Sequence, residues 1–168
     1  MKTSYLRTIV FACLFIGSTF FIACKNDKKE EQISNEFSLS TTQYDKVFDA
    51  YLKLSDALVK EEVKNAQKHA NQMATAYEFD ENEIVLLAVT ISEIEDLEEQ
   101  RTLFYQLSER MEYLLDKHIS SGEVYKQYCP MAFDDTGAFW FSTSKEIINP
   151  YFGDKMLHCG EIQKTIKK

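Results

Sequence analysis

The sequence predicts a mainly α-helical fold, namely an antiparallel four-helix bundle with a C-terminal β-hairpin and an irregular subregion, rich in Cys and Met, packed on it. The first observation is that the 168 residues include only 5 Gly and 2 Pro, too few for the many turns of an all-β sandwich. The second is that apolar residues recur at helical spacing between residues 41 and 119. The third is that four of the Gly, both Pro and the only Trp fall after Ser121. The length is that of one domain.

Residues 1–23 are expected to form an export signal. Lys2 and Arg7 precede an uncharged, largely apolar run that extends to Ala23. This run has about 16 residues, fewer than the roughly 20 that a helix needs to cross a bilayer. The alternative is a signal anchor that stays uncleaved.

The segment Phe21-Ile22-Ala23-Cys24 resembles a bacterial lipoprotein cleavage box, and Cys24 is therefore the expected lipidated N-terminus. Cleavage would discard Cys13 and change the formal net charge from −8 to −10, because Lys2 and Arg7 leave with the signal. Residues 24–40 are polar and predict a lipidated Cys followed by a solvated tether. The expected location is the cell envelope, with a lipid anchor, on the periplasmic or outer-membrane face.

Four amphipathic helices are expected in a single domain over residues 41–165. The periodicity places them at about 41–60, 61–77, 80–94 and 97–119. Thr41 or Thr42 is the expected N-cap of the first helix. No Gly or Pro separates the last two helices, so one long helix is the alternative, and we expect a break near residues 95–100 because short antiparallel helices bury all four apolar faces.

A β-hairpin is expected after the helices. Residues 124–128 and 138–142 are rich in aromatic and β-branched side chains, and Asp134-Asp135-Thr136-Gly137 between them predicts a turn. Residues 149–153 predict a turn or a single helical turn.

The charge and the missing motifs exclude several functions. A net charge of −8 argues against nucleic-acid binding, which depends on Lys and Arg at phosphates. The chain has no Glu-x-x-His for a di-iron bundle, no Cys-x-x-Cys for thiol exchange and no glycine-rich phosphate loop. No nucleophile has a plausible local base, so we assign no catalytic residue and do not expect an enzyme.

The remaining chemistry lies in two Cys- and Met-containing segments. If residues 127–133 are extended, Cys129 and Met131 project to the same face. One helical turn would likewise bring Met156 and Cys159 to one side, with His158 as an additional candidate ligand. Two thiolates and two thioethers favour Cu(I) or Ag(I) over hard cations. The alternative is a Cys129–Cys159 disulfide, which would stabilise an exported protein by roughly 3 kcal/mol.

Several motifs resemble those of an uncharacterised domain family, DUF3347. They are Tyr-x-x-Tyr-Cys-Pro-Met-Ala at 125–132, Gly-Ala-Phe-Trp-Phe-Ser at 137–142, Ile-Asn-Pro-Tyr-Phe-Gly-Asp at 148–154, Met-Leu-x-Cys-Gly at 156–160 and, in the last helix, Arg-x-x-Phe-x-x-Leu-Ser-x-x-Met at 101–111. The resemblance covers about residues 37–162.

The resemblance implies a cell-envelope function linked to metals. That family occurs as small bacterial lipoproteins and as an appendage of periplasmic adaptor subunits of heavy-metal efflux pumps. It therefore implies a soft-metal ligand set of Cys129, Met131, Met156 and Cys159 and an efflux adaptor as partner. Short metal-binding modules of copper and silver pumps, which the Cys-Pro-Met segment also resembles, usually have His where this chain has Ala132. With the resemblance included, metal binding and a disulfide are about equally supported, and a reversible Cys pair could serve both.

Overall fold

The computed structural model of the protein describes residues 39–77, 82–119 and 121–167, which fall in one compact unit. The expected export signal, Cys24 and the tether up to residue 38 lie outside the described residues. Leu39 and Ser40, the last two residues of the expected tether, belong to the fold. Leu39 is buried in the core, and Ser40 caps the first helix.

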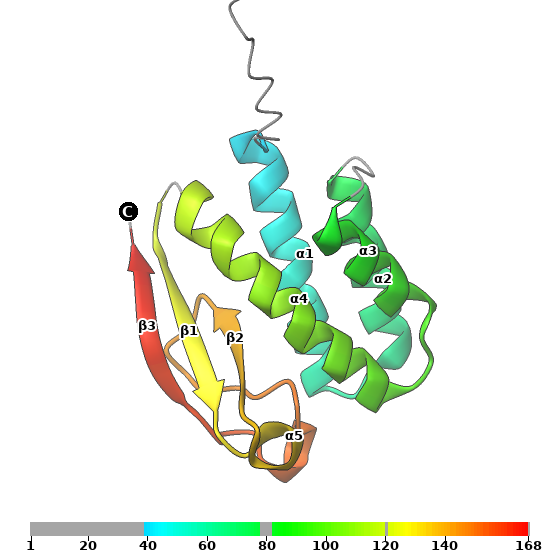
Figure 1. Ribbon diagram of the computed structural model, residues 1–168, viewed down its shortest axis with the longest axis vertical. Coiled ribbons are helices and arrows are strands. Elements are labelled where there is room, and N and C mark those ends of the chain that lie inside the picture. Colours follow the sequence, from blue (N-terminus) through cyan, green and yellow to red (C-terminus); the bar gives the residue numbers. More distant parts are fainter. Residues whose placement is uncertain (1–38, 78–81, 120, 168) are drawn as a thin grey trace, which may run out of the picture. The chain divides into compact units, whose positions relative to one another are not determined.

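Four helices follow one another along the first two thirds of this unit. Each packs against the next, and the first also contacts the last. Figure 1 shows the fourth helix running between the other helices and the sheet, and this helix contacts both the third helix and strand β2. The helices are α1 (Thr41–Val59), α2 (Val63–Ala76), α3 (Glu83–Glu93) and α4 (Leu97–His118).

The helix ends differ in detail from the expected ones. Ser40, not Thr41 or Thr42, is the N-cap of α1, because its side chain accepts from the backbone of Gln43 while Gln43 bonds back in a capping box. The expected break between the last two helices is confirmed and spans residues 94–96. Asp96 is the N-cap of α4, because its carboxylate accepts a hydrogen bond from the backbone N–H of Glu99. This cap marks the start of a separate helix after α3.

The C-terminal third forms a three-stranded antiparallel sheet with strand order β2-β1-β3. The expected hairpin is confirmed, because β1 pairs with β2 from Tyr125–Ser142 to Cys129–Ala138. The third strand was not expected from the sequence, and it pairs with the other edge of β1. The strands are β1 (Glu123–Cys129), β2 (Ala138–Ser142) and β3 (Glu161–Lys167).

The core joins the sheet to the helices through aromatic side chains. The rings of Tyr51 on α1 and Phe104 on α4 stack with centroids 4.9 Å apart. The Tyr51 hydroxyl lies 2.7 Å from Ser108 Oγ and accepts a hydrogen bond of 3.2 Å from the backbone N–H of Phe141 on β2. Burial of each such ring stabilises the fold by about 3 kcal/mol, so this contact fixes β2 on the helices.

One expectation about the chain near Cys129 is wrong. Residues 127–133 are not extended throughout, because β1 ends at Cys129 and a tight turn begins. Pro130 lacks an N–H for the ladder and ends the pairing. As a result Cys129 is fully buried, whereas the side chain of Met131 is 46% exposed. The two residues do not share one strand face.

Within residues 39–77, 82–119 and 121–167, no helix combines the length and the apolar character needed to cross a membrane.

Candidate functional site

The two cysteines expected to act together are in contact. Cys129 is the last residue of β1, and Cys159 lies just before β3. Because Tyr128 pairs with Glu161 across these strands, the residues that flank this pair are brought together. The Sγ atoms are 2.8 Å apart and both cysteines are free. A disulfide bond measures about 2.05 Å, so the sulfurs are in contact without being bonded.

The loop that carries Cys159 is folded around a buried asparagine. Asn149 is fully buried and donates from Nδ2 to the carbonyl of Cys159 at 3.0 Å. Its Oδ1 accepts from the backbone N–H of Tyr151 at 2.8 Å, and its own N–H donates to Leu157 O at 2.8 Å. At Gly160, φ is +148°, and a Cβ would lie 2.9 Å from Tyr128 O, so only glycine permits this close crossing.

The environment keeps Cys159 protonated at neutral pH. The hydrogen bond with Cys129 and, second, burial raise the pKa of the Cys159 thiol to about 11, although a hydrogen bond from the Met131 backbone opposes the shift. The thiol is therefore a weak nucleophile when no metal is bound, and a metal that binds it must displace a proton.

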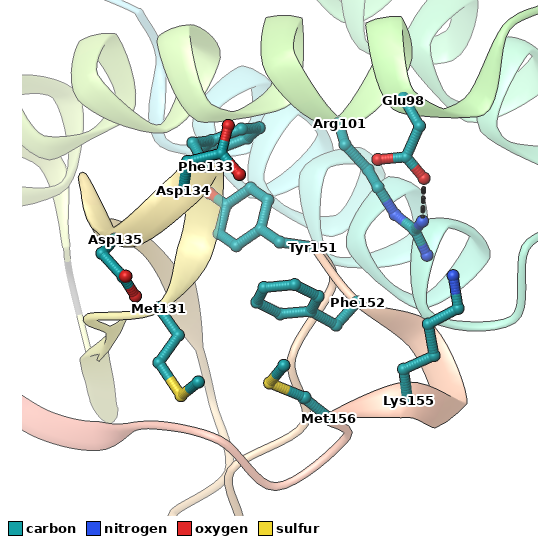
Figure 2. A pocket seen from close by; sticks show the side chains of 10 residues that line it. All are labelled: Glu98, Arg101, Met131, Phe133, Asp134, Asp135, Tyr151, Phe152, Lys155 and Met156. Atoms are coloured by element: carbon teal, nitrogen blue, oxygen red, sulfur yellow. Dashed lines mark hydrogen bonds and ion pairs between the residues drawn. The ribbon is translucent and has the colours of Figure 1, made fainter.

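The two expected methionine ligands lie in a pocket next to the thiol pair. Met131 and Met156 line a pocket of about 540 Å³, whereas neither cysteine lines it. Figure 2 shows both thioethers at the edge of the pocket that faces away from α4, pointing toward each other. The four sulfur atoms thus fall into a thiol pair and a thioether pair.

A left-handed turn forms one wall of this pocket. In α5 (Ala132–Asp135), Phe133, Asp134 and Asp135 have φ of 52°, 53° and 65°. Such a conformation costs about 1–2 kcal/mol for a residue such as Phe, whereas Asp adopts it more readily. The ring of Phe133 packs 5.3 Å from that of Tyr151, which helps to hold the turn.

Arg101 on α4 forms part of the opposite wall of the pocket. The sequence alone did not identify it as a site residue. It is buried, and each of its three side-chain nitrogens donates: it bonds to Glu98 at 2.6 Å, to Glu61 at 3.3 Å, and to two backbone carbonyls, Pro150 O at 3.0 Å and Leu58 O at 3.3 Å. The signal that could have found it is a charged residue on the apolar face of α4.

His158, the additional candidate ligand, is exposed and lies with Nδ1 2.9 Å from Ile147 O. No group of three or more His, Cys, Asp or Glu side chains that could hold a metal occurs in the described part of the chain. A metal site among these residues would therefore use the two thiols together with thioethers.

The fold and the site define a small, mainly helical domain in which an antiparallel sheet packs on the helices. A pair of thiols in this domain lies beside a pocket lined by two thioethers. Residues 47–122 match the profile of the family described as "Protein of unknown function (DUF3347)". The resemblance to DUF3347 is confirmed over this segment, which runs from within α1 to the residue before β1. No significant match was found among curated proteins or solved structures.

Proposed function

We propose that the chain is a lipid-anchored domain of the cell envelope that binds Cu(I) or Ag(I) and either buffers the ion or passes it to a heavy-metal efflux system. The observation that carries this proposal is the contact between Cys129 and Cys159, whose Sγ atoms lie 2.8 Å apart although thirty residues separate them in sequence. Thiolates and thioethers are the soft donors that Cu(I) prefers. Met131 and Met156 add two thioethers nearby.

The thiol pair fits a metal only if the sulfurs separate. With metal–sulfur bonds of about 2.3 Å, the observed separation would force an S–metal–S angle of about 75°. Two sulfurs on opposite sides of one ion would be about 4.6 Å apart. Cys159 is the partner able to move, because it is half-buried in a loop, whereas Cys129 is fully buried at the end of β1.

The proposal also includes a lipid anchor, a four-helix bundle and a partner protein. Cys24 would carry the lipid after removal of residues 1–23, and the resemblance to DUF3347 supports a periplasmic efflux adaptor as partner. We further propose that α1 to α4 form an antiparallel four-helix bundle, which is supported by the contacts between successive helices.

The experiment is a Cu(I) titration of the reduced full-length protein, purified in detergent, against a competing chelator. We expect one tightly bound Cu(I) per chain. A Cys129→Ser/Cys159→Ser variant should lose this binding, and it controls for Cys13 and Cys24. A His158→Asn variant tests the additional candidate ligand. Binding that is unchanged in the double Ser variant would refute the proposal.

A second candidate is a non-enzymatic interaction module stabilised by a Cys129–Cys159 disulfide. The same contact supports it, because two free thiols at 2.8 Å need to move little to form a bond. Counting free thiols in protein isolated from the cell envelope separates the two candidates. Complete oxidation, together with unchanged copper tolerance after deletion of the protein, would favour the module.

A further inference from the structure

The four sulfur-bearing residues differ in their exposure to solvent, with Met131 the most exposed, Met156 and Cys159 half-buried and Cys129 fully buried. Met131 is 46% exposed and Met156 is half-buried, whereas Cys129 has no exposed surface. Met131 comes from the turn after β1, and Met156 follows the 3₁₀ turn η1 (Gly153–Lys155). Figure 2 shows the two sulfur-bearing ends directed toward each other across one edge of the pocket. An ion that enters the pocket therefore meets the thioethers, because Met131 and Met156 line it and neither cysteine does.

Each methionine lies close in sequence to one of the two cysteines. Met131 follows Cys129 by two residues. The Cys159 N–H in turn donates to the carbonyl of Met156 at 3.0 Å. The thioether pair and the thiol pair thus belong to the same two turns of chain, with each methionine two or three residues from a cysteine.

The charges around the pocket favour the approach of a cation. Asp134 and Asp135 line it from the left-handed turn, and Glu98 lines it from α4. Glu98 is paired with the buried Arg101, which leaves Asp134 and Asp135 opposed by one basic residue of the lining, Lys155. A concave surface with more acids than bases raises the local concentration of cations. A neutral thioether binds a soft cation without first losing a proton.

We propose that Met131 and Met156 form a separate, solvent-accessible loading site for a soft monovalent cation, from which the ion passes to Cys129 and Cys159. This inference rests on the proposed function and divides its four sulfur ligands into two successive sites. During transfer the metal–thioether bonds break and two metal–thiolate bonds form, while both thiol protons leave to solvent. No electron is transferred, so the ion keeps its charge.

The test uses reduced full-length protein, Ag(I) in chloride-free buffer and the fluorescence of Trp140 in a stopped-flow instrument. Trp140 is the only Trp, and its ring borders Gly160, the residue after Cys159. We expect Met131→Leu/Met156→Leu to slow Ag(I) uptake about tenfold while changing the final affinity less than about threefold. Leu conserves the volume of Met and is tolerated best. Met111→Leu, a swap in the core, is the matched control and should leave the rate unchanged.

A second measurement examines the loading site without the thiols. In Cys129→Ser/Cys159→Ser protein with ¹³C-methyl methionine, Ag(I) should shift the methyl signals of Met131 and Met156 and leave those of the buried Met73 and Met111 in place. Unshifted signals, or an unchanged uptake rate in the Leu variant, would overturn the inference. An affinity that falls in proportion to the rate would also overturn it, because the four sulfurs would then act as one site. If the wild-type thiols bind no Ag(I), the proposed function and the transfer step fail, and the methyl shifts then decide the thioether site alone.

Discussion

Replacing Asn149 with Ala should destabilise the loop that presents Cys159. Asn149 is fully buried, and its side chain makes two hydrogen bonds to backbone groups, from Nδ2 to Cys159 O at 3.0 Å and from Tyr151 N–H to Oδ1 at 2.8 Å. Alanine removes both partners at once. The bond from the Asn149 backbone to Leu157 O remains, so the perturbation is confined to the side chain.

The expected loss follows from the two backbone groups that are left unpaired. Each of the two buried groups without a partner costs about 1–3 kcal/mol, so the free energy of unfolding should fall by about 2–6 kcal/mol. Small domains have only about 5–15 kcal/mol in total. With a urea m-value of about 2 kcal/mol/M, a loss of 3 kcal/mol lowers the midpoint by about 1.5 M.

The assay is urea unfolding of the reduced protein, followed by Trp140 fluorescence. Asn71→Ala is the matched control, because Asn71 is exposed on α2 and alanine is a better helix former, so stability should stay the same or rise slightly. Hydrogen exchange at the Tyr151 N–H should also accelerate in the Asn149 variant. A loss of less than about 1 kcal/mol would show that water replaces both hydrogen bonds and that Asn149 does not hold the loop.

Three further outcomes are expected. Arg101→Met leaves Pro150 O without its donor, whereas Leu58 O keeps the backbone N–H of Glu61, so the variant should lose about 1–3 kcal/mol in thermal unfolding. The exposed carboxylate partners regain water, and full stability in this variant would contradict the bracing role. Oxidation that joins Cys129 and Cys159 should stabilise the protein by about 3–4 kcal/mol in urea unfolding and have no effect in the double Ser variant. Because the pKa of Cys159 is raised to about 11, its thiolate fraction at pH 8 is about two hundred times below that of an ordinary cysteine. Alkylation of Cys159, followed by peptide mass spectrometry, should therefore be at least about tenfold slower than for a free thiol and accelerate with pH up to about 11; a rate that levels off near pH 9 would contradict the raised pKa.

The helical part of the fold could be predicted because its sequence pattern is strongly periodic. The expected helices at 41–60, 61–77 and 97–119 differ from the observed ones by no more than two residues at either end. Burial of one face per helix explains this agreement, since apolar residues at helical spacing have few other ways to leave water. The N-cap was missed by one residue because Ser and Thr residues succeed one another there and all favour this position.

The C-terminal third was less predictable because tertiary contacts determine it. Strand β3 has only one buried residue among seven, Ile166, so no apolar alternation indicates a strand, and its pairing with β1 defines it instead. The left-handed turn at residues 133–135 contradicts the local preference of Phe133, whereas aspartate adopts this conformation more readily, and ring contacts of Phe133 with Tyr105 and Tyr151 compensate. Sequence spacing brought the thiols together correctly, but it could not show that Pro130 turns Met131 away from Cys129.

The contact between Cys129 and Cys159 makes metal binding and oxidation mutually exclusive under the proposed function. Each sulfur can form either a bond to the other sulfur or a bond to the ion, because a disulfide has no thiolate to offer a soft metal. The number of ions that the domain holds would then follow the redox state of its compartment. The thioethers of Met131 and Met156 take no part in that oxidation, so the oxidised domain would keep its loading site and lose only the site formed by Cys129 and Cys159. A protein that binds Ag(I) weakly when oxidised and tightly when reduced is therefore the expected result, and equal affinity in both states would mean that the thiols do not hold the metal.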